Sequence, residues 1–409
     1  MSRRVAVTGM AGVSPIGSDW RGIRKHLESY RNAVVRMEEW AEYDGLYTQL
    51  GSPAVEFSLS ERFNRKTTRS MGRIALMATH ASELALTDAG LLDDPLLTSG
   101  GMGVSFGSSA GTPKAIGDFG RMIQEKTTKG INANTYIKMM AHTAPVNIGV
   151  FFGLTGRVIT TSSACTSGSQ GIGYAYEAIR RGVQKAMIAG GAEELCATEA
   201  AVFDTLFATS VRNDAPDMTP RPFDADRDGL VIGEGAGSLI LEDLEHAKAR
   251  VAKIYAEIVG FGTNSDGTHV TQPNSATMQV AMELALADAG LPPSAIGYVN
   301  AHGTGTQQGD IAESHATSRL FGSKQAISSL KSYTGHTLGA CGALEAWMSI
   351  EMMREGWFAP TINLNRVDPE CAELDYIVET GRPIQCEYVM SNNFAFGGIN
   401  TSLIFKRYR

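Results

Sequence analysis

Residues 158–179, VITTSSACTSGSQGIGYAYEAI, combine a short apolar strand, a turn of small and hydroxyl residues, and an amphipathic helix. Cys165 stands where the turn meets the helix. A free cysteine in this place is often only a small buried hydrophobe. It is also where a nucleophile would stand, because the N-terminus of a helix stabilises a thiolate. This stretch alone leaves both interpretations open.

A second stretch, residues 326–350, repeats this order of strand, small-residue turn and helix as AISSLKSYTGHTLGACGALEAWMSI. His336 lies near the place that Cys165 holds in the first stretch. Such turns are common in α/β folds, so the repeat is evidence for an internal duplication rather than proof of one. Two similar halves would bring the two turns to a common centre.

Strands and helices that end at glycine alternate along the rest of the chain. Glycine contributes 45 residues, many of them directly after apolar runs such as RVAVTGMAG at residues 4–12. This alternation predicts an α/β fold with largely parallel sheets. Helical patterns that end at glycine, the usual residue after a helix, cover residues 69–90, 168–182, 274–290 and 342–356.

Composition and charge exclude several classes of protein. The chain has 409 residues, of which 43% are hydrophobic and 19% charged, a globular profile with ample material for a core. Its net charge of −7 argues against a general nucleic-acid binder. We expect no membrane span and no signal peptide, because no apolar run is long enough and the N-terminus has the pattern of a strand. The five cysteines lack metal-ligand spacing, so we expect free thiols in a reducing cytoplasm.

Two histidines join Cys165 as candidate catalytic residues. His302 lies in NAHGTGTQQGD (residues 300–310), just after a predicted strand, and His336 lies in a similar glycine-rich turn. A single histidine is more often structural than catalytic. Two of them at strand ends, in turns that let the backbone approach a ligand closely, indicate a site.

Six motifs, in order, resemble those of the β-ketoacyl-acyl-carrier-protein synthases, and the type II (elongating, Cys-His-His) group of the thiolase-like superfamily is the best match. The motifs are SSACTSGSQGIGYA (162–175), RPFDADRDGLVIGEGAGSLILEDLEHAKAR (221–250), YAEIVGFGTNSDGTH (255–269), YVNAHGTGTQQGD (298–310), KSYTGHTLGACGALEA (331–346) and SNNFAFGGINTSLIF (391–405). The resemblance runs from Arg4 to Phe405. No single motif is specific, but six in order are.

The resemblance implies the thiolase-like fold, an α/β architecture in which two similar halves form a five-layered α-β-α-β-α core. It implies an N-terminal half with the nucleophile at residues 1–250 and a C-terminal half with the histidines at residues 251–409. It also implies a homodimer, or a heterodimer with a related ketosynthase-like subunit. The expected partner is an acyl carrier protein bearing acyl or malonyl phosphopantetheine, and no metal, nucleotide or redox cofactor is needed.

The same resemblance gives roles to individual residues. Cys165 matches the family nucleophile, and His302 and His336 match its two catalytic histidines. Lys331 matches the lysine before the second histidine, and Glu345 matches the glutamate on the following helix.

The implied reaction is a decarboxylative Claisen condensation that extends an acyl chain by two carbons, in fatty-acid or polyene/polyketide biosynthesis. Cys165 would take the acyl group from a carrier, and the helix dipole would lower its pKa enough to give a thiolate near neutral pH. Phe396, in NFAFGG, matches the gating phenylalanine, and its backbone N–H and that of Cys165 would form the oxyanion hole. Two neutral imidazoles, each donating one hydrogen bond, would stabilise the malonyl-derived enolate without protonating its carbanion.

Three related classes of protein fit less well. A thiolase brings a second cysteine near the C-terminus, where this chain has FAFGGIN. An initiating type III synthase needs asparagine where SYTGH supplies His336. A non-catalytic partner subunit resembling a chain-length factor would share the fold but lack Cys165, and it is the alternative function.

Two departures from the family pattern bear on the substrate. After His302 the run is TGTQQGD, with Gln307 and Gln308, where fatty-acid elongating enzymes often carry a proline. The run FGSSAGTP places the small Ala110 at the acyl-pocket gate, where many such enzymes carry a bulky residue. Both changes leave the chemistry intact and admit a specialised synthase that builds a polyene or polyketide chain.

Carrier binding requires a local basic patch, because acyl carrier proteins are acidic and this chain is negative overall. The best candidate is RFNRKTTR (residues 62–69), with Arg65, Lys66 and Arg69 at helix-like spacing. Arg212, in SVRND, matches a carrier-contact position of the family. A solvated helix face is the alternative explanation for the patch.

Overall fold

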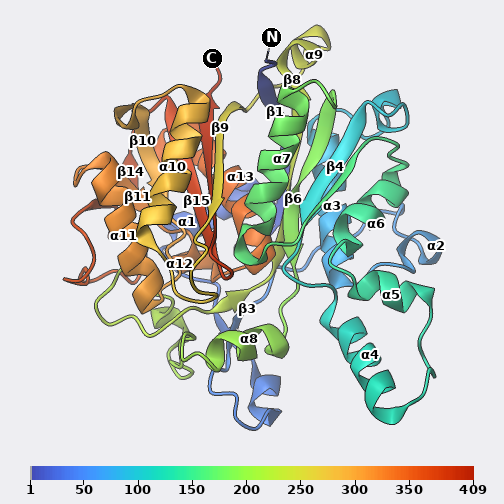
Figure 1. Ribbon diagram of the computed structural model, residues 1–409, viewed down its shortest axis with the longest axis horizontal. Helices are drawn as coiled ribbons and strands as arrows, with labels where there is room; N and C mark the ends of the chain where they lie inside the picture. The colour runs from blue at the N-terminus through green and yellow to red at the C-terminus, as the bar shows by residue number, and fades with distance from the viewer. Residues whose placement is uncertain (1) are drawn as a thin grey trace.

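An eleven-stranded mixed sheet runs through the computed structural model, which describes residues 2–409 (Figure 1). Its strand order is β13-β11-β10-β15-β16-β9-β1-β8-β6-β4-β5. The first part of the chain contributes β1 (Val5–Val13), β4 (Met102–Gly107), β5 (Val158–Thr161), β6 (Ala186–Glu193) and β8 (Gly235–Asp243). The second part contributes β9 (Ala256–Ser265), β10 (Ile296–Asn300), β11 (Ala326–Ser328), β13 (Asp375–Tyr376), β15 (Tyr388–Ala395) and β16 (Ile399–Arg407).

The two parts of the sheet repeat one topology. Outward from the middle, the first runs β1-β8-β6-β4-β5 and the second runs β9-β16-β15-β10-β11. In each part the first two pairings are antiparallel and the next two are parallel. The strands therefore correspond one to one. The repeated stretches of the sequence occupy matching places, because each contains the outer strand, β5 or β11, and leads into a long helix, Ser167–Arg180 or Cys341–Glu355.

The two parts of the sheet form two β layers, with one pair of helices between them and further helices on each outer face. The core is therefore layered α-β-α-β-α (Figure 1). The outer helices are α3 (Arg73–Asp88) and α6 (Thr143–Phe152) on one side, and α10 (Ser275–Ala289) with α11 (Gln307–Phe321) beside it on the other. The inner pair is α7 (Ser167–Arg180) and α13 (Cys341–Glu355), which pack against each other and against both parts of the sheet.

Small residues let the two inner helices meet at their N-termini. A Cβ added at Gly168 would lie 2.8 Å from the carbonyl oxygen of Gly339, and one added at Gly342 would lie 2.6 Å from the backbone nitrogen of Ser169. These separations are too short for a real side chain. The glycines in CTSGSQG and GACGAL are therefore required for packing, and they draw the two strand-to-helix turns together.

The two turns are also strained in the same way. β5 enters the 3₁₀ turn η3 (Ala164–Thr166) before α7, and the turn η6 (Leu338–Ala340) precedes α13. Ala164 and Leu338 occupy matching left-handed conformations, with φ of 50° and 44°. This region is uncommon for residues other than glycine and costs energy, so the surrounding packing must hold it.

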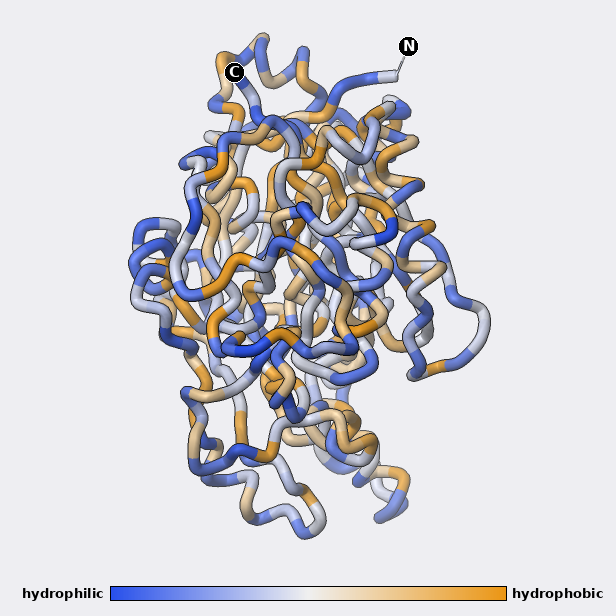
Figure 2. Tube along the Cα trace, turned by 90° about the vertical axis from the view of Figure 1, so that its left-hand side faces the viewer, coloured by the Kyte–Doolittle hydropathy of each residue, from blue (hydrophilic) through white to orange (hydrophobic). Residues whose placement is uncertain are grey.

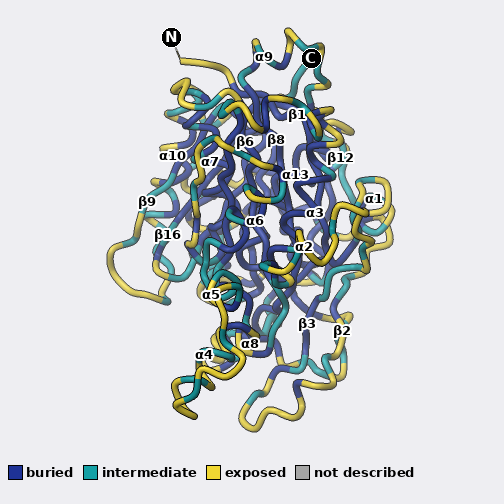
Figure 3. The backbone as a smooth tube through the Cα atoms, turned by 90° about the vertical axis from the view of Figure 1, so that its right-hand side faces the viewer, coloured by how far each residue is buried: buried dark blue, intermediate teal, exposed yellow. Residues whose placement is uncertain are grey.

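The remaining elements surround this core. They are α1 (Trp20–Glu28), α2 (Arg65–Thr68), α4 (Pro113–Glu125), α5 (Ala133–Met139), α8 (Ala197–Asp204), α9 (Leu244–Ala249), α12 (Lys331–Thr334), and the short strands β2 (Val35–Arg36), β3 (Leu50–Ser52), β7 (Ile232–Gly233), β12 (Trp357–Phe358) and β14 (Arg382–Pro383). Apolar segments concentrate in the middle of the molecule (Figure 2), where the inner strands and helices are buried, whereas much of α4 is exposed (Figure 3). Among residues 2–409, no helix combines the length and apolar character needed to cross a bilayer.

Candidate active site

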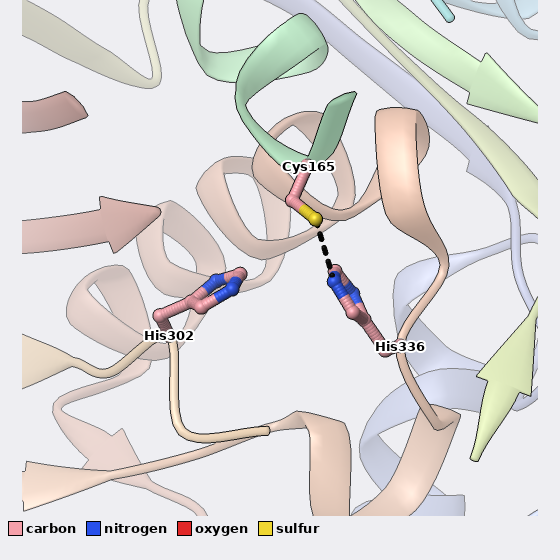
Figure 4. A group of neighbouring side chains, drawn as sticks. All are labelled: Cys165, His302 and His336. Carbon is pink, nitrogen blue, oxygen red and sulfur yellow. Dashed lines mark hydrogen bonds between the residues drawn. The ribbon is translucent and has the colours of Figure 1, made fainter. Parts of the chain in front are cut away.

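Cys165 is buried where β5 passes through η3 into α7. Its Sγ lies 3.0 Å from Nε2 of His336 (Figure 4). His302 faces the same point, with its ring centroid 5.1 Å from that of His336 and the two rings nearly perpendicular. The sulfur and one nitrogen of each ring lie within 4.8 Å of one another. The fold thus gathers at one point the three residues that the sequence singled out.

A buried glutamate on α11 holds the turn that carries His302. The backbone N–H groups of His302 and Gly303 each donate to Glu313, both at 2.7 Å. Asp310, one helical turn earlier, accepts two further backbone N–H groups of the same turn at 3.0 and 3.2 Å. Burial raises the pKa of Glu313 to about 8, although the N–H groups of His302 and Gly303 that donate to it act to lower the pKa. The backbone of His302 is therefore fixed to the start of α11.

His336 is fixed by backbone bonds to the segment that contains β7. Its N–H donates to the carbonyl of Val231 at 2.7 Å, and its carbonyl accepts from Gly233 at 2.9 Å. Burial, and after it the ammonium of Lys331, lowers the pKa of both His336 and His302 well below the usual range. Both imidazoles are therefore neutral at physiological pH.

Lys331 and Glu345 form a fully buried ion pair next to the histidines. Burial by itself lowers the pKa of Lys331, but Glu345 and other nearby acidic groups outweigh it, so the pKa is raised. The ammonium stays charged, and its field opposes a positive charge on either imidazole. Removing one partner alone would leave an unpaired buried charge, at a cost of about 3–5 kcal/mol.

The pKa of Cys165 contradicts the expectation from the sequence. Burial raises it to about 12, although Lys331 and the backbone N–H groups of Phe396 and Cys165 itself act to lower it. The expected resting thiolate near neutral pH is therefore not supported, because desolvation outweighs the lowering effects of Lys331 and the two backbone N–H groups on the pKa. The thiol instead has a neutral base, His336, within reach to take its proton when it attacks.

The three residues open into a mostly apolar cavity of about 370 Å³. Phe203 of α8 and Phe396 line it, with ring centroids 4.8 Å apart. Phe207, which is 84% exposed, lines it further out. Apolar walls around a buried thiol suit an acyl chain better than a charged substrate.

Ala110 is not among the residues that line this cavity. It lies in the turn between β4 and α4, where its carbonyl accepts a hydrogen bond from Ser108. Glu193 joins this turn to η6, because it accepts from the N–H groups of Ser109 at 2.8 Å and Gly339 at 3.0 Å. The gate role of Ala110 stays a prediction.

The basic residues predicted to bind a carrier fall into two groups. Arg65, Lys66 and Arg69 are exposed on α2 and just after it, and within residues 2–409 no carboxylate lies at ion-pair distance from them. Arg212 is partly neutralised, because its guanidinium lies 3.3 Å from Asp228. The basic patch on α2 is therefore more available than Arg212 to pair with the acidic groups of a carrier.

Sequence reasoning missed four residues that contact the triad or hold it: Asp310, Glu313, Cys341 and Asn393. The acids of QGDIAE, three residues apart, were a usable signal, because in a helix they would lie on one face and could reach back to the turn before it. Cys341, whose thiol donates to the carbonyl of Cys165 at 3.3 Å, and Asn393 carried no comparable signal. Both residues act through contacts with elements that are distant in the sequence, so their roles could not be predicted before the packing of those elements was known.

The donor atoms of the triad are also close enough to hold a soft cation such as Zn²⁺. The buried ammonium of Lys331 opposes a cation at that point. A thiol beside a neutral base, with a second neutral imidazole opposite, is better suited to acyl transfer.

The whole chain matches proteins of one kind. The family models described as beta-ketoacyl synthase, N-terminal domain, and beta-ketoacyl synthase, C-terminal domain, match residues 2–247 and 255–365. The 3-oxoacyl-[acyl-carrier-protein] synthase 2 of Vibrio harveyi is 38% identical over 417 aligned positions, which cover 99% of each chain.

Two solved structures match over the full length of both chains. A beta-ketoacyl synthase from Burkholderia phymatum STM815 is 59% identical, with a TM-score of 0.98 and 100% of each chain covered. A type II polyketide synthase acyl-carrier protein in complex with its ketosynthase bound to the hexaketide, AntDE:AntF, gives 31% identity and a TM-score of 0.85, again over 100% of each chain. The predicted thiolase-like fold is confirmed, and the chain belongs to the β-ketoacyl synthase family.

Proposed function

We propose that this chain is an elongating β-ketoacyl-acyl-carrier-protein synthase, an acyltransferase that condenses a malonyl thioester with an acyl group held on Cys165. The observation that carries the proposal is the 3.0 Å contact between Sγ of Cys165 and Nε2 of a neutral His336, with His302 facing the same point. A thiol with its own base can take an acyl group, and two neutral imidazoles can stabilise an enolate.

The first half-reaction transfers the acyl group to the enzyme. As Cys165 attacks the thioester carbonyl, its proton passes to Nε2 of His336. The bond between the acyl carbon and the carrier sulfur breaks, and the departing sulfur takes that proton. The backbone N–H groups of Cys165 and Phe396 face the sulfur and are well placed to bind the oxyanion.

The second half-reaction forms the carbon–carbon bond. The malonyl thioester loses carbon dioxide, and the N–H groups of His302 and His336 stabilise the enolate oxygen. The enolate carbon attacks the acyl group on Cys165, the bond from that carbonyl to Sγ breaks, and the thiol is restored by protonation. The product is a β-ketoacyl thioester two carbons longer. Because burial, and after it the ammonium of Lys331, keeps both imidazoles neutral, neither is acidic enough to quench the carbanion.

The expected partner is an acyl carrier protein in the cytoplasm. In the related AntDE:AntF structure a type II polyketide synthase acyl-carrier protein is in complex with its ketosynthase, and the exposed basic patch on α2 suits an acidic partner. We further propose a dimer, of two identical or two related subunits. The division into halves at residues 1–250 and 251–409 is supported by the repeated strand order.

The alternative, a non-catalytic partner subunit, would have no use for the Cys165–His336 contact. Intact-mass spectrometry after incubation with acyl carriers separates the two. We expect one acyl adduct on the wild type, none on Cys165→Ala, and an unchanged adduct on the control Cys386→Ala, a free cysteine that does not line the cavity. An adduct that persists in Cys165→Ala would contradict the proposal.

The histidines are tested by measuring acylation and malonyl decarboxylation separately. His302→Ala should lower decarboxylation about a hundredfold or more and spare acylation of Cys165. His336→Ala should impair both steps, because His336 lies 3.0 Å from the thiol. Wild-type decarboxylation in both variants would refute these roles.

A further inference from the structure

Asn393 lies buried in β15, beside the catalytic site. Its side-chain nitrogen Nδ2 donates to Oε2 of Glu345 at 2.8 Å. The same nitrogen lies 3.5 Å from Nδ1 of His302 and 3.6 Å from Sγ of Cys341. One amide group therefore touches the buried ion pair, a catalytic imidazole and a second thiol.

The contact with Glu345 determines which end of the amide faces the site. Glu345 pairs with the charged Lys331, so its carboxylate can only accept hydrogen bonds, and the group opposite it must be the NH₂. One hydrogen of that NH₂ goes to Glu345. The other points toward His302 and Cys341, and the ring nitrogen is the stronger acceptor because a thiol sulfur accepts only weakly.

A donor at Nδ1 determines where His302 carries its single proton. An imidazole nitrogen that accepts a hydrogen bond bears no hydrogen, so the proton of neutral His302 must lie on Nε2. Nδ1 of His336, by contrast, meets no hydrogen-bonding group among residues 2–409, so either tautomer is open to that ring. This difference suits the two roles: His336 must first accept a proton and later donate, whereas His302 only donates.

We propose that Asn393 is a positioning residue that holds His302 in the Nε2–H tautomer, ready to donate to the enolate. The proposal rests on the proposed function. It adds a residue on β15 that acts through His302 and does not itself touch the substrate. Decarboxylation should depend on Asn393, and acylation of Cys165, which uses His336, should not.

Two substitutions test this role. Asn393→Leu has nearly the same shape and removes the donor. Asn393→Asp keeps the shape and presents an acceptor to Nδ1. The matched control is Asn392→Leu: Asn392 is the adjacent buried asparagine of β15, and its side chain contacts Ser402 and Met282 instead.

The tautomer of His302 is read directly by NMR of enzyme containing ¹⁵N-labelled histidine, with its signals assigned by their loss in His302→Gln. We expect an Nε2–H pattern in the wild type and in Asn392→Leu. Asn393→Leu should give a mixture of tautomers, and Asn393→Asp a shift to Nδ1–H. Unchanged His302 signals in both Asn393 variants would overturn the proposal.

Kinetics provides the second readout. Malonyl decarboxylation should fall about tenfold in Asn393→Leu and about a hundredfold in Asn393→Asp, with acylation of Cys165 within about threefold of wild type. Equal losses in both steps would mean that Asn393 is only structural. If wild-type Cys165 were not acylated at all, the proposed function would fail, yet the NMR readout would still decide the tautomer. If Asn393→Leu did not fold, the isosteric Asn393→Asp would carry the test.

Discussion

At the scale of the single residue, burial affects the pKa of Cys165 more than the nearby ammonium of Lys331 and the backbone N–H donors do. Its pKa is raised to about 12, so only a small fraction of the thiol is ionised at neutral pH. As long as the pH stays below the pKa, the ionised fraction rises about tenfold for each unit by which the pH increases. We therefore expect alkylation of Cys165 by iodoacetamide to accelerate about tenfold per unit from pH 7 to pH 10, as followed by intact mass.

The shape of this pH profile is the decisive observation. Cys165→Ala serves as the control that assigns the label. A rate that levels off below pH 8 would mean a resting thiolate paired with a protonated His336, which the lowered pKa of His336 argues against.

Ala110 gives a second prediction at this scale, about chain length. If it is the pocket gate, Ala110→Phe should preserve turnover of short acyl carriers and suppress long ones, because forcing a chain past the added ring costs about 1–3 kcal/mol. Ala110→Ser, which stays small, is the control. Condensation is measured on short, long saturated and long conjugated acyl carriers. Equal slowing of every acyl chain would mean that Ala110 has only a packing role. The residues to test next as the gate would then be Phe203 and Phe396, whose rings lie together in the cavity lining.

The residues of the site were predictable to different degrees. Cys165 and His336 stand in repeated turns, so the sequence could indicate that they meet. The pKa of Cys165 could not be predicted, because it depends on how deeply the turn is buried. Asn393 was equally inaccessible, since the bond to Glu345 joins β15 to α13, two elements that only the folded chain brings together.

At the scale of the element, small residues determine how closely α7 and α13 approach. Glycines stand in both turns of the sequence, but the close approach of the two helices was not predicted from them. The sequence also did not show that Ala164 and Leu338 would adopt left-handed conformations, because neither residue favours them. Neighbouring elements impose that geometry, and it directs Cys165 toward His336.

The short helix α2 gives a prediction about the carrier. Arg65, Lys66 and Arg69 are exposed, whereas the nearby Arg62 bonds to Asp93 at 2.8 Å. Reversing both charges in Lys66→Glu/Arg69→Glu should raise the KM for carrier-bound substrate about tenfold or more at low salt. The KM for a small thioester mimic should not change, since such a mimic does not need the patch.

The control for this effect is a matched charge reversal at the far end of α7. Arg181 and Lys185 follow that helix, about 20 Å from Cys165 given the length of its 14 residues. Arg181→Glu/Lys185→Glu should leave both KM values near wild type. Equal effects on carrier-bound and small substrates in the α2 variant would make the patch an ordinary solvated surface.

At the scale of the whole molecule, the duplication leaves the sheet with two unequal edges. On the side of β11, the short strand β13 extends the sheet by one more strand. On the side of β5 no further strand of residues 2–409 follows, and Val158 is 49% exposed there. An open apolar edge strand is a template for pairing with another chain. Two copies related by a two-fold axis could join their β5 strands into one continuous sheet.

The backbone of β5 shows which residue to change. Val104 of β4 donates to the carbonyl of Arg157, so alternate residues of β5 face β4. By that alternation, Val158 and Thr160 direct their backbone groups to the open edge. Proline at position 160 would remove an outward N–H and leave the pairing with β4 in place.

We therefore expect Thr160→Pro to weaken dimerisation about a hundredfold or more, with the mass followed by light scattering across a dilution series. Thr160→Val, which keeps the N–H and favours a strand, should stay dimeric like the wild type. Because β5 leads directly into the turn that carries Cys165, condensation should fall in parallel with dissociation. A Thr160→Pro protein that keeps the wild-type mass at every concentration would place the dimer interface elsewhere, with the exposed Ile123 and Tyr136 of α4 and α5 as the next surface to test.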